Sequence, residues 1–235
     1  MHPFLGEFIG TALLVLLGTG VVANVVLTKT KGQNSGWIVI TFGWAMAVFL
    51  GVYTCTQLGG SGHLNPAVTL AVGVFSDFDK SLIAPYIAAQ FGGAITGAIL
   101  AWAVYKQHFD ETTDKDLKLA VFCTAPAIRN TVSNLIAEII GTFVLVFGAL
   151  SISKPTTSLG TLDALPVALL VLGIGLSLGG PTGYAINPAR DLGPRLAHFI
   201  LPIPAKRNSD WSYAWIPVVG PVIGASIAAW LFSML

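Results

Sequence analysis

Six stretches of this chain are apolar over about the length that a helix needs to cross a lipid bilayer. A membrane-spanning α-helix takes about 20 mostly apolar residues. Only 10 % of the 235 residues are charged, whereas soluble domains carry about 25 %. The sequence therefore predicts an all-α integral membrane protein with six transmembrane helices, at Phe4–Leu27, Trp37–Leu58, Leu82–Tyr105, Ser133–Ser153, Leu165–Leu178 and Trp211–Leu235.

Two further apolar pieces, Pro66–Phe75 and Pro188–Ile200, are too short to span, and each opens with the Pro of an Asn-Pro-Ala tripeptide. Asn is a favoured N-cap, and Pro suits the first helical position, where a missing N–H costs nothing. Asn65 and Asn187 are therefore predicted to start two re-entrant half-helices. A single tripeptide would suit an ordinary surface turn, but two copies before half-length helices favour a shared site.

The two halves of the chain repeat one another. EFIGTALLV at Glu7 resembles EIIGTFVLV at Glu138, GGAITGA resembles VGPVIGA, and each half holds one Asn-Pro-Ala in the same order. Three spans per half turn the second half upside down in the membrane. The sequence predicts one transmembrane domain of two inverted repeats, approximately residues 1–105 and 133–235, joined by a linker of residues 106–132. GGAITGA and GPVIGA also place small residues four apart, which indicates close helix packing.

Inverted repetition would bring the two half-helix starts together near the midplane. The positive ends of two helix dipoles then meet, and each Asn offers side-chain N–H groups. The pattern indicates a pore with two fixed donors that passes neutral, oxygen-bearing molecules and repels cations, protons included. Arg190 directly follows the second tripeptide, and an Arg inside a membrane is expected to face a water-filled path or to have partners.

Other classes of partner find no support in the sequence. The net charge of +1 gives no reason to expect nucleic acid. The two cysteines form no Cys/His cluster that would indicate a metal. Nucleotide-binding and nucleophile-elbow motifs are absent from the sequence, so we expect no cofactor and no enzymatic chemistry.

The paired Asn-Pro-Ala boxes, the Glu-x-x-Gly-Thr repeats and the six-plus-two helix pattern resemble the major intrinsic proteins, the aquaporins and glycerol facilitators. The resemblance covers nearly the whole chain. It implies an aquaporin-like homotetramer in the cell membrane, with cytoplasmic termini and one pore per subunit. The loop charges disagree, because the positive-inside rule would put the termini outside.

The resemblance also implies a narrow selectivity filter of Trp44, Gly175, Tyr184 and Arg190. Gly175 leaves room where water channels of the family usually carry His. Trp44 and Tyr184 would form an apolar wedge for the carbon side of a polyol, with Arg190 binding its hydroxyls from the opposite wall. Glycerol facilitators commonly have Phe at the Tyr184 position, and the added hydroxyl is expected to narrow and polarise the filter. The NPARD sequence ending at Asp191 resembles the glycerol-facilitator version of the box.

Glu7 and Glu138 are the only acids inside full spans, and buried carboxylates need partners. The resemblance implies that both accept hydrogen bonds from the re-entrant loops. Loop carbonyls would then face the pore as a ladder of acceptors, at Gly62, His63, Leu64, Gly183, Ala185 and Ile186. Asp191, in the first turn of its half-helix, is expected to favour the helix dipole or to pair with an Arg such as Arg195.

The expected function is passive conduction of glycerol and similar polyols, with some water and without ions or protons. The same pore would also suit protonated lactic acid, dihydroxyacetone, hydrogen peroxide or mainly water. A different class is a proton-coupled secondary transporter that uses Glu7 and Glu138. Two further classes are an intramembrane enzyme, for which the sequence offers no nucleophile–base pair, and a structural membrane protein with a closed pore.

Overall fold

The computed structural model describes residues 3–152 and 157–235, which form helices, turns and connecting segments without strands. Five helical stretches in these ranges are long and apolar enough to cross a membrane. Two of them, Lys80–Glu111 and Gly160–Leu178, begin with a 3₁₀ turn. The elements are α1 (Pro3–Val26), α2 (Trp37–Gln57), α3 (Pro66–Phe75), η1 (Lys80–Leu82), α4 (Ile83–Glu111), α5 (Lys115–Ala120), α6 (Thr131–Ser151), η2 (Gly160–Ala164), α7 (Leu165–Leu178), α8 (Pro188–Ile200) and α9 (Ile216–Phe232).

Three predicted boundaries need correction. The third span continues as α4 to Glu111, because the buried Phe109 and the ion pair between Lys106 and Asp110, at 2.9 Å, extend the helix past Tyr105. The predicted linker of residues 106–132 therefore begins inside α4 and also holds α5. The last span begins at Ile216, after a turn over residues 211–215. The predicted end of the fourth span at Ser153 lies outside the described residues.

Glycines allow the long helices to pack with their backbones almost in contact. A Cβ atom added at Gly93 or Gly97 of α4 would lie 2.3 Å from a carbonyl oxygen of α1. A Cβ added at Gly224 of α9 would lie 2.2 Å from a carbonyl oxygen of α6. Real side chains cannot approach so closely, so these findings confirm that the small residues spaced four apart mark close helix packing.

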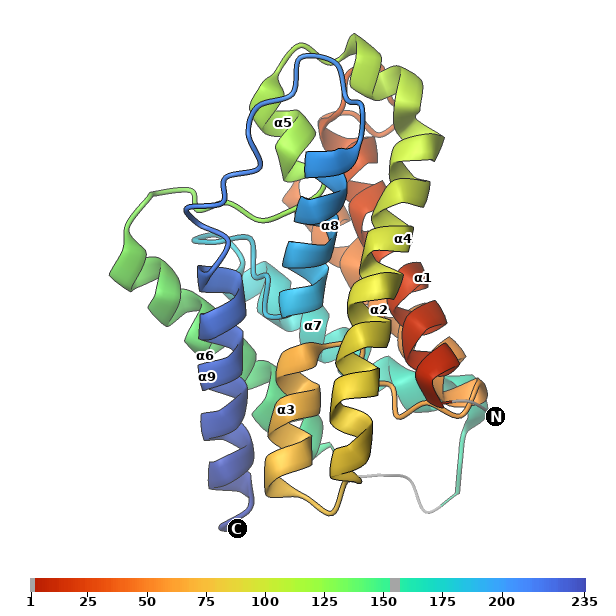
Figure 1. The fold of residues 1–235 in the computed structure, drawn as a ribbon, viewed down its shortest axis with the longest axis vertical. Helices are drawn as coiled ribbons and strands as arrows, with labels where there is room; N and C mark the ends of the chain where they lie inside the picture. Colours follow the sequence, from red (N-terminus) through yellow and green to blue (C-terminus); the bar gives the residue numbers. More distant parts are fainter. Residues whose placement is uncertain (1–2, 153–156) are drawn as a thin grey trace.

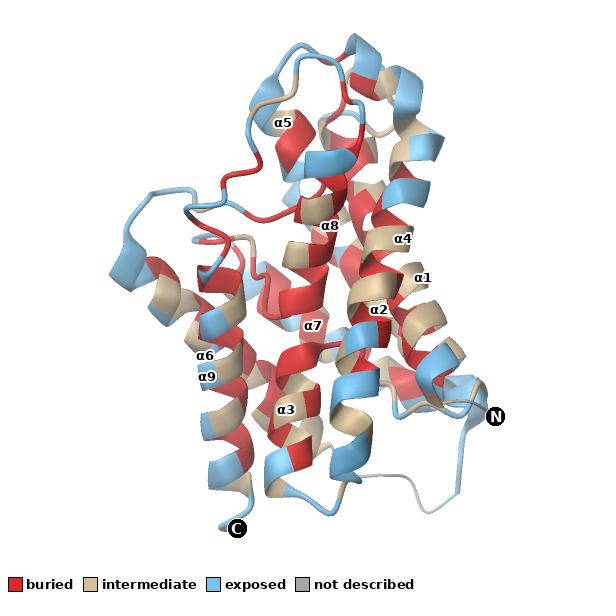
Figure 2. Ribbon diagram, in the orientation of Figure 1, coloured by how far each residue is buried: buried red, intermediate tan, exposed pale blue. Residues whose placement is uncertain are grey.

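The two half-helices α3 and α8 lie one above the other in the middle of the molecule (Figure 1). Their facing ends are buried, whereas the outward faces of α4 and α9 carry many exposed residues (Figure 2). The start of α1 and the end of α9 lie toward the lower end, and α5 lies at the upper end (Figure 1). This arrangement puts the starts of α3 and α8 at one depth inside a shell of long helices.

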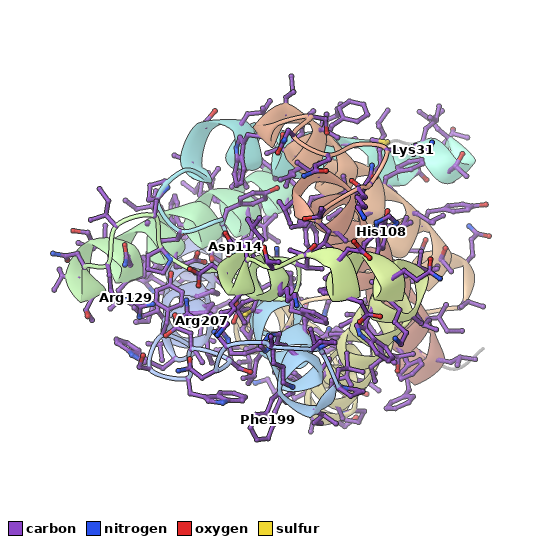
Figure 3. All side chains as sticks on the ribbon, turned by 90° about the horizontal axis from the view of Figure 1, so that it is seen from above. Lys31, His108, Asp114, Arg129, Phe199 and Arg207 are labelled. Atoms are coloured by element: carbon purple, nitrogen blue, oxygen red, sulfur yellow. The ribbon has the colours of Figure 1, made fainter. Side chains whose placement is uncertain are left out.

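The outward faces of the long helices are apolar. Ile38, Val104, Ile136 and Leu169 are between 48 % and 71 % exposed. Contact between so large an apolar surface and water is unfavourable, whereas contact with the apolar tails of lipids is not. Charged side chains are found at the upper end, among them Lys31, Asp114, Arg129 and Arg207 (Figure 3). The fold is thus that of a multi-pass membrane protein.

Candidate pore and selectivity filter

Asn65 and Asn187 cap the two half-helices with their side chains. Asn65 Oδ1 accepts a hydrogen bond from Ala67 N at 3.0 Å. Asn187 Oδ1 accepts two, from Ala189 N at 3.0 Å and Arg190 N at 3.2 Å. Each Asn thereby satisfies N–H groups that a helix start leaves without partners.

The same two side chains join the halves of the chain. Asn65 Nδ2 donates to Ile186 O at 2.8 Å, and Asn187 Nδ2 donates to Leu64 O at 2.8 Å. Each cap therefore bonds to the residue just before the other cap. One hydrogen of each amide group remains for a passing solute, because an Asn NH₂ has two donors.

Both re-entrant loops contain residues in the left-handed region of backbone space. Leu64 has φ 49°, Tyr184 has φ 40° and Ile186 has φ 44°. This conformation costs about 1–2 kcal/mol for each residue that is not glycine. The loops therefore need contacts that hold them in place.

Glu7 and Glu138 supply these contacts. Glu7 accepts hydrogen bonds from His63 N at 2.9 Å and Leu64 N at 2.8 Å. Glu138 accepts them from Ala185 N at 3.0 Å and Ile186 N at 2.8 Å. Both carboxylates are fully buried, and their bonding fixes each loop by its backbone N–H groups.

A cavity of about 910 Å³ runs along these loops. Its walls include Asn65, Asn187, Trp44, Tyr184 and Arg190. Of the six residues predicted to form a carbonyl ladder, five line the cavity: Gly62, His63, Leu64, Ala185 and Ile186. Gly183 does not line it. The carbonyls of Leu64 and Ile186 already accept from the Asn caps, so each has one lone pair left for a solute.

Arg190 carries the charge of this cavity. Its guanidinium carbon lies 4.0 Å from the centre of the Trp44 ring, a cation–π distance. Its Nη1 donates to Phe122 O at 3.4 Å. Among residues 3–152 and 157–235, no carboxylate lies within 4.0 Å of the guanidinium. Arg190 therefore stacks on Trp44 instead of facing it from the opposite wall, and its positive charge is not neutralised.

Tyr184 occupies a notch in α7. A Cβ added at Gly175 would lie 2.8 Å from Tyr184 Cζ and 3.0 Å from its Oη, and one added at Gly179 would lie 2.5 Å from its Cδ1. Gly175 does not line the cavity. This corrects two expectations: Gly175 makes room for the Tyr184 ring and not directly for a solute, and the hydroxyl is buried beside Gly175. Within the described part of the chain, that hydroxyl has no hydrogen-bond partner.

Asp191 fixes the half-helix α8 to two neighbouring segments. It forms a fully buried ion pair with Arg195, at 2.7 Å. Its Oδ2 accepts from both the N and the Oγ1 of Thr124, each at 2.7 Å. Arg195 in turn donates to Ser209 O at 2.7 Å. The position of Arg190 in the filter thus depends on a network that starts at the next residue.

A second ion pair lies in the connections at the same end. Arg129 donates to Asp210, with 2.5 Å between Nη2 and Oδ2. Burial would raise the pKa of the Asp210 carboxyl, but the hydrogen bonds from Arg129 and Ser212 outweigh it and hold the pKa below its usual value. Asp210 is therefore an ionised anchor for the segment that Arg195 also contacts.

Comparison with known proteins agrees with this geometry. The family model described as Major intrinsic protein matches residues 1–232. The chain belongs to the major intrinsic protein family. Members of this family are channels, so the chain is a membrane channel and not an enzyme.

Three known proteins illustrate the similarity to other major intrinsic proteins. A probable glycerol uptake facilitator protein of Thermotoga maritima is 56 % identical over 235 residues, which cover 100 % of both chains. A D/L-lactic acid transporter of Lactiplantibacillus plantarum is 41 % identical over 236 residues, covering 98 % of this chain and 96 % of the relative. The X-ray structure of the aquaglyceroporin from Plasmodium falciparum matches with a TM-score of 0.86 at 29 % identity, covering 99 % of this chain and 95 % of that one.

Sequence reasoning missed several residues around the pore of this major intrinsic protein. Thr124 and Phe122 lie in the predicted linker, and no motif connects them to Asp191 or Arg190. Gln90 donates to Glu7 at 2.8 Å from a span that shows only packing glycines in the sequence. Trp37 was interpreted only as the start of a span. Gly175 in α7 and Gly179 at its C-cap, four residues apart, were the signal that another ring packs closely there.

Proposed function

We propose that this major intrinsic protein is a passive channel for glycerol and similar small polyols, with some water and without ions or protons. The observation that carries the proposal is the filter: the apolar ring of Tyr184 lines the same cavity as the Arg190 guanidinium stacked on Trp44. Stacking leaves the N–H donors at the edge of the guanidinium, where those not bonded to Phe122 O can bind a solute. Apolar surface beside such donors suits an amphipathic solute. The relative named a probable glycerol uptake facilitator supports the same substrate class.

Conduction is proposed to work by exchange of hydrogen bonds. A polyol leaves its hydration water at the filter, where Arg190 donates to its hydroxyl oxygens. Loop carbonyls such as those of Gly62 and His63 accept from its hydroxyl groups, and the amides of Asn65 and Asn187 donate to them. Cations are repelled because the unneutralised Arg190 and the starts of α3 and α8 are all positive.

The family resemblance supports a membrane location, an oligomeric state and an orientation for the pore. We propose that the channel lies in the cell membrane as a homotetramer, with one pore per subunit and cytoplasmic termini. The start of α1 and the end of α9 lie toward the same, lower end of the molecule, which supports an even number of crossings (Figure 1). Accessibility of cysteines introduced at each end to an impermeant thiol reagent in intact cells tests the orientation.

The substrate is tested by stopped-flow light scattering of proteoliposomes. Shrinkage and re-swelling are followed with water, glycerol, dihydroxyacetone and lactic acid across a pH series. Fast glycerol permeation that does not saturate is expected. Slow glycerol permeation with fast lactic acid permeation at low pH would contradict glycerol as the substrate, and no flux above protein-free liposomes would contradict an open channel.

A further inference from the structure

Trp37 contacts the filter from outside the pore. It is the first residue of α2, it is 42 % exposed, and it does not line the cavity. Its indole Nε1 donates to Gly175 O at 3.0 Å. Gly175 lies in the last turn of α7, where carbonyls lack intrahelical partners, so this bond joins the start of α2 to the end of α7.

The Trp37 ring also packs against the filter ring itself. Its centroid lies 5.9 Å from that of Tyr184, with the planes at 80°, which is the edge-to-face geometry that aromatic pairs prefer. A Cβ added at Gly179 would lie 2.8 Å from Trp37 Cζ2 and 2.5 Å from Tyr184 Cδ1. Trp37 and Tyr184 therefore both pack against one surface, formed by Gly175 and Gly179 at the C-terminal end of α7, which we call the glycine face.

The glycine face has to fix the Tyr184 ring without help from the Tyr184 hydroxyl. Within the described residues the hydroxyl makes no hydrogen bond, so packing alone holds the ring. The ring packs against Gly175 and Gly179, where an added Cβ would lie 2.8 Å from its Cζ and 2.5 Å from its Cδ1, respectively. The edge of Trp37 adds a contact that, if removed, would leave space into which the ring can move.

We infer that Trp37 is a positioning residue for the selectivity filter, holding the Tyr184 ring at the place that sets the largest polyol admitted. The inference rests on the proposed function, because it takes a polyol as the solute. A ring that moves into the space left by Trp37 widens the filter. Larger solutes gain more from such widening than glycerol does, so size selection changes more than total flux.

The test compares erythritol and glycerol permeability in proteoliposomes, normalised to the amount of inserted protein. Trp37→Ala is expected to raise the erythritol-to-glycerol ratio at least about threefold, since pocket fit discriminates solutes that differ by one carbon. Trp37→Phe keeps an aromatic edge and is expected to restore most of the wild-type ratio. The matched control is Trp230→Ala on α9, a Trp that is 48 % exposed and should leave the ratio unchanged.

A double variant tests whether Trp37 acts through Tyr184. In a Tyr184→Ala background, Trp37→Ala is expected to add no further change, because the ring that it positions is gone. An equal rise in both backgrounds would overturn the inference. So would an unchanged ratio in Trp37→Ala when the wild type conducts glycerol. A wild type without glycerol flux would instead overturn the proposed function and the inference together.

Gly179→Ala tests the same glycine face without removing Trp37, and it is expected to change the permeability ratio in the opposite direction. The added Cβ is expected to push the Tyr184 ring toward the pore, so that the erythritol-to-glycerol ratio falls at least about twofold. Gly180→Ala is the control, because a Cβ there meets nothing within 4 Å. If Trp37→Ala does not insert into the membrane, an unchanged ratio in Gly179→Ala overturns the inference.

Discussion

The Tyr184 hydroxyl is a polar group whose burial brings no hydrogen bond among the described residues, and this decides what its removal does. A buried, unpaired polar group costs about 1–3 kcal/mol. Tyr184→Phe is therefore expected to be at least as stable as the wild type in thermal unfolding in detergent. Its glycerol permeability should stay within about twofold, a free-energy change below about 0.5 kcal/mol. A larger loss of flux would mean that the hydroxyl contacts the solute.

Gly175 is expected to be far less tolerant than its neighbours on α7. In Gly175→Ala the new methyl would lie 2.8 Å from Tyr184 Cζ and 2.9 Å from Thr41 Cγ2, so the ring has to move toward the pore. We expect glycerol permeability to fall at least about fivefold, because the displaced ring narrows the filter, and overpacking of this kind also typically lowers stability by about 1–3 kcal/mol. Gly173→Ala, whose Cβ meets nothing within 4 Å, should conduct like the wild type in the same liposome assay.

At the scale of the half-helices, the two Asn caps are similar but not equal. Asn187 accepts two backbone hydrogen bonds and Asn65 accepts one. Loss of an N-cap costs about 0.5–2 kcal/mol, and each Asn→Ala change also removes a bond to the other loop. We expect Asn187→Ala to lower the unfolding midpoint in detergent more than Asn65→Ala. The reverse order would show that capping is not what distinguishes them.

The ion pair on α8 offers a comparison with a surface pair of the same spacing. Asp191→Asn leaves Arg195 fully buried without its counter-charge, which typically costs about 3–5 kcal/mol. Asp110→Asn breaks the exposed pair with Lys106, also four residues apart, and should cost at most about 1 kcal/mol. Denaturant unfolding in micelles measures both. Equal losses would contradict an anchoring role for the buried pair.

At the scale of the whole molecule, the features that could be predicted from sequence are those that follow from composition or from a repeated motif. Apolar length indicated the long helices, and the two tripeptides indicated where the half-helices begin. Their relation as inverted repeats stays a prediction. The end of the third span was wrong, because a surface ion pair and one buried Phe continue α4 into a polar segment.

The filter could be predicted only as a set of residues. Its geometry depends on contacts between residues far apart in the chain, such as Trp37 with Gly175 and Arg190 with Trp44. The sequence shows no period or motif for these pairs. This explains why the expected wall for Arg190 and the expected polarising effect of the Tyr184 hydroxyl were wrong, although Trp44, Tyr184 and Arg190 all line the cavity.

The bonding of the two buried glutamates predicts how transport responds to a proton gradient. Both oxygens of each carboxylate already accept hydrogen bonds: Glu7 from His63, Leu64 and Gln90, and Glu138 from Thr182, Ala185 and Ile186. These hydrogen bonds give each glutamate a structural role in holding its loop, so neither is expected to carry protons across the membrane. The initial rate of glycerol uptake into proteoliposomes should therefore be proportional to the glycerol gradient and unchanged by an imposed pH gradient. Accumulation of glycerol driven by the pH gradient would require one glutamate to leave its loop, and would replace the passive channel with a coupled transporter.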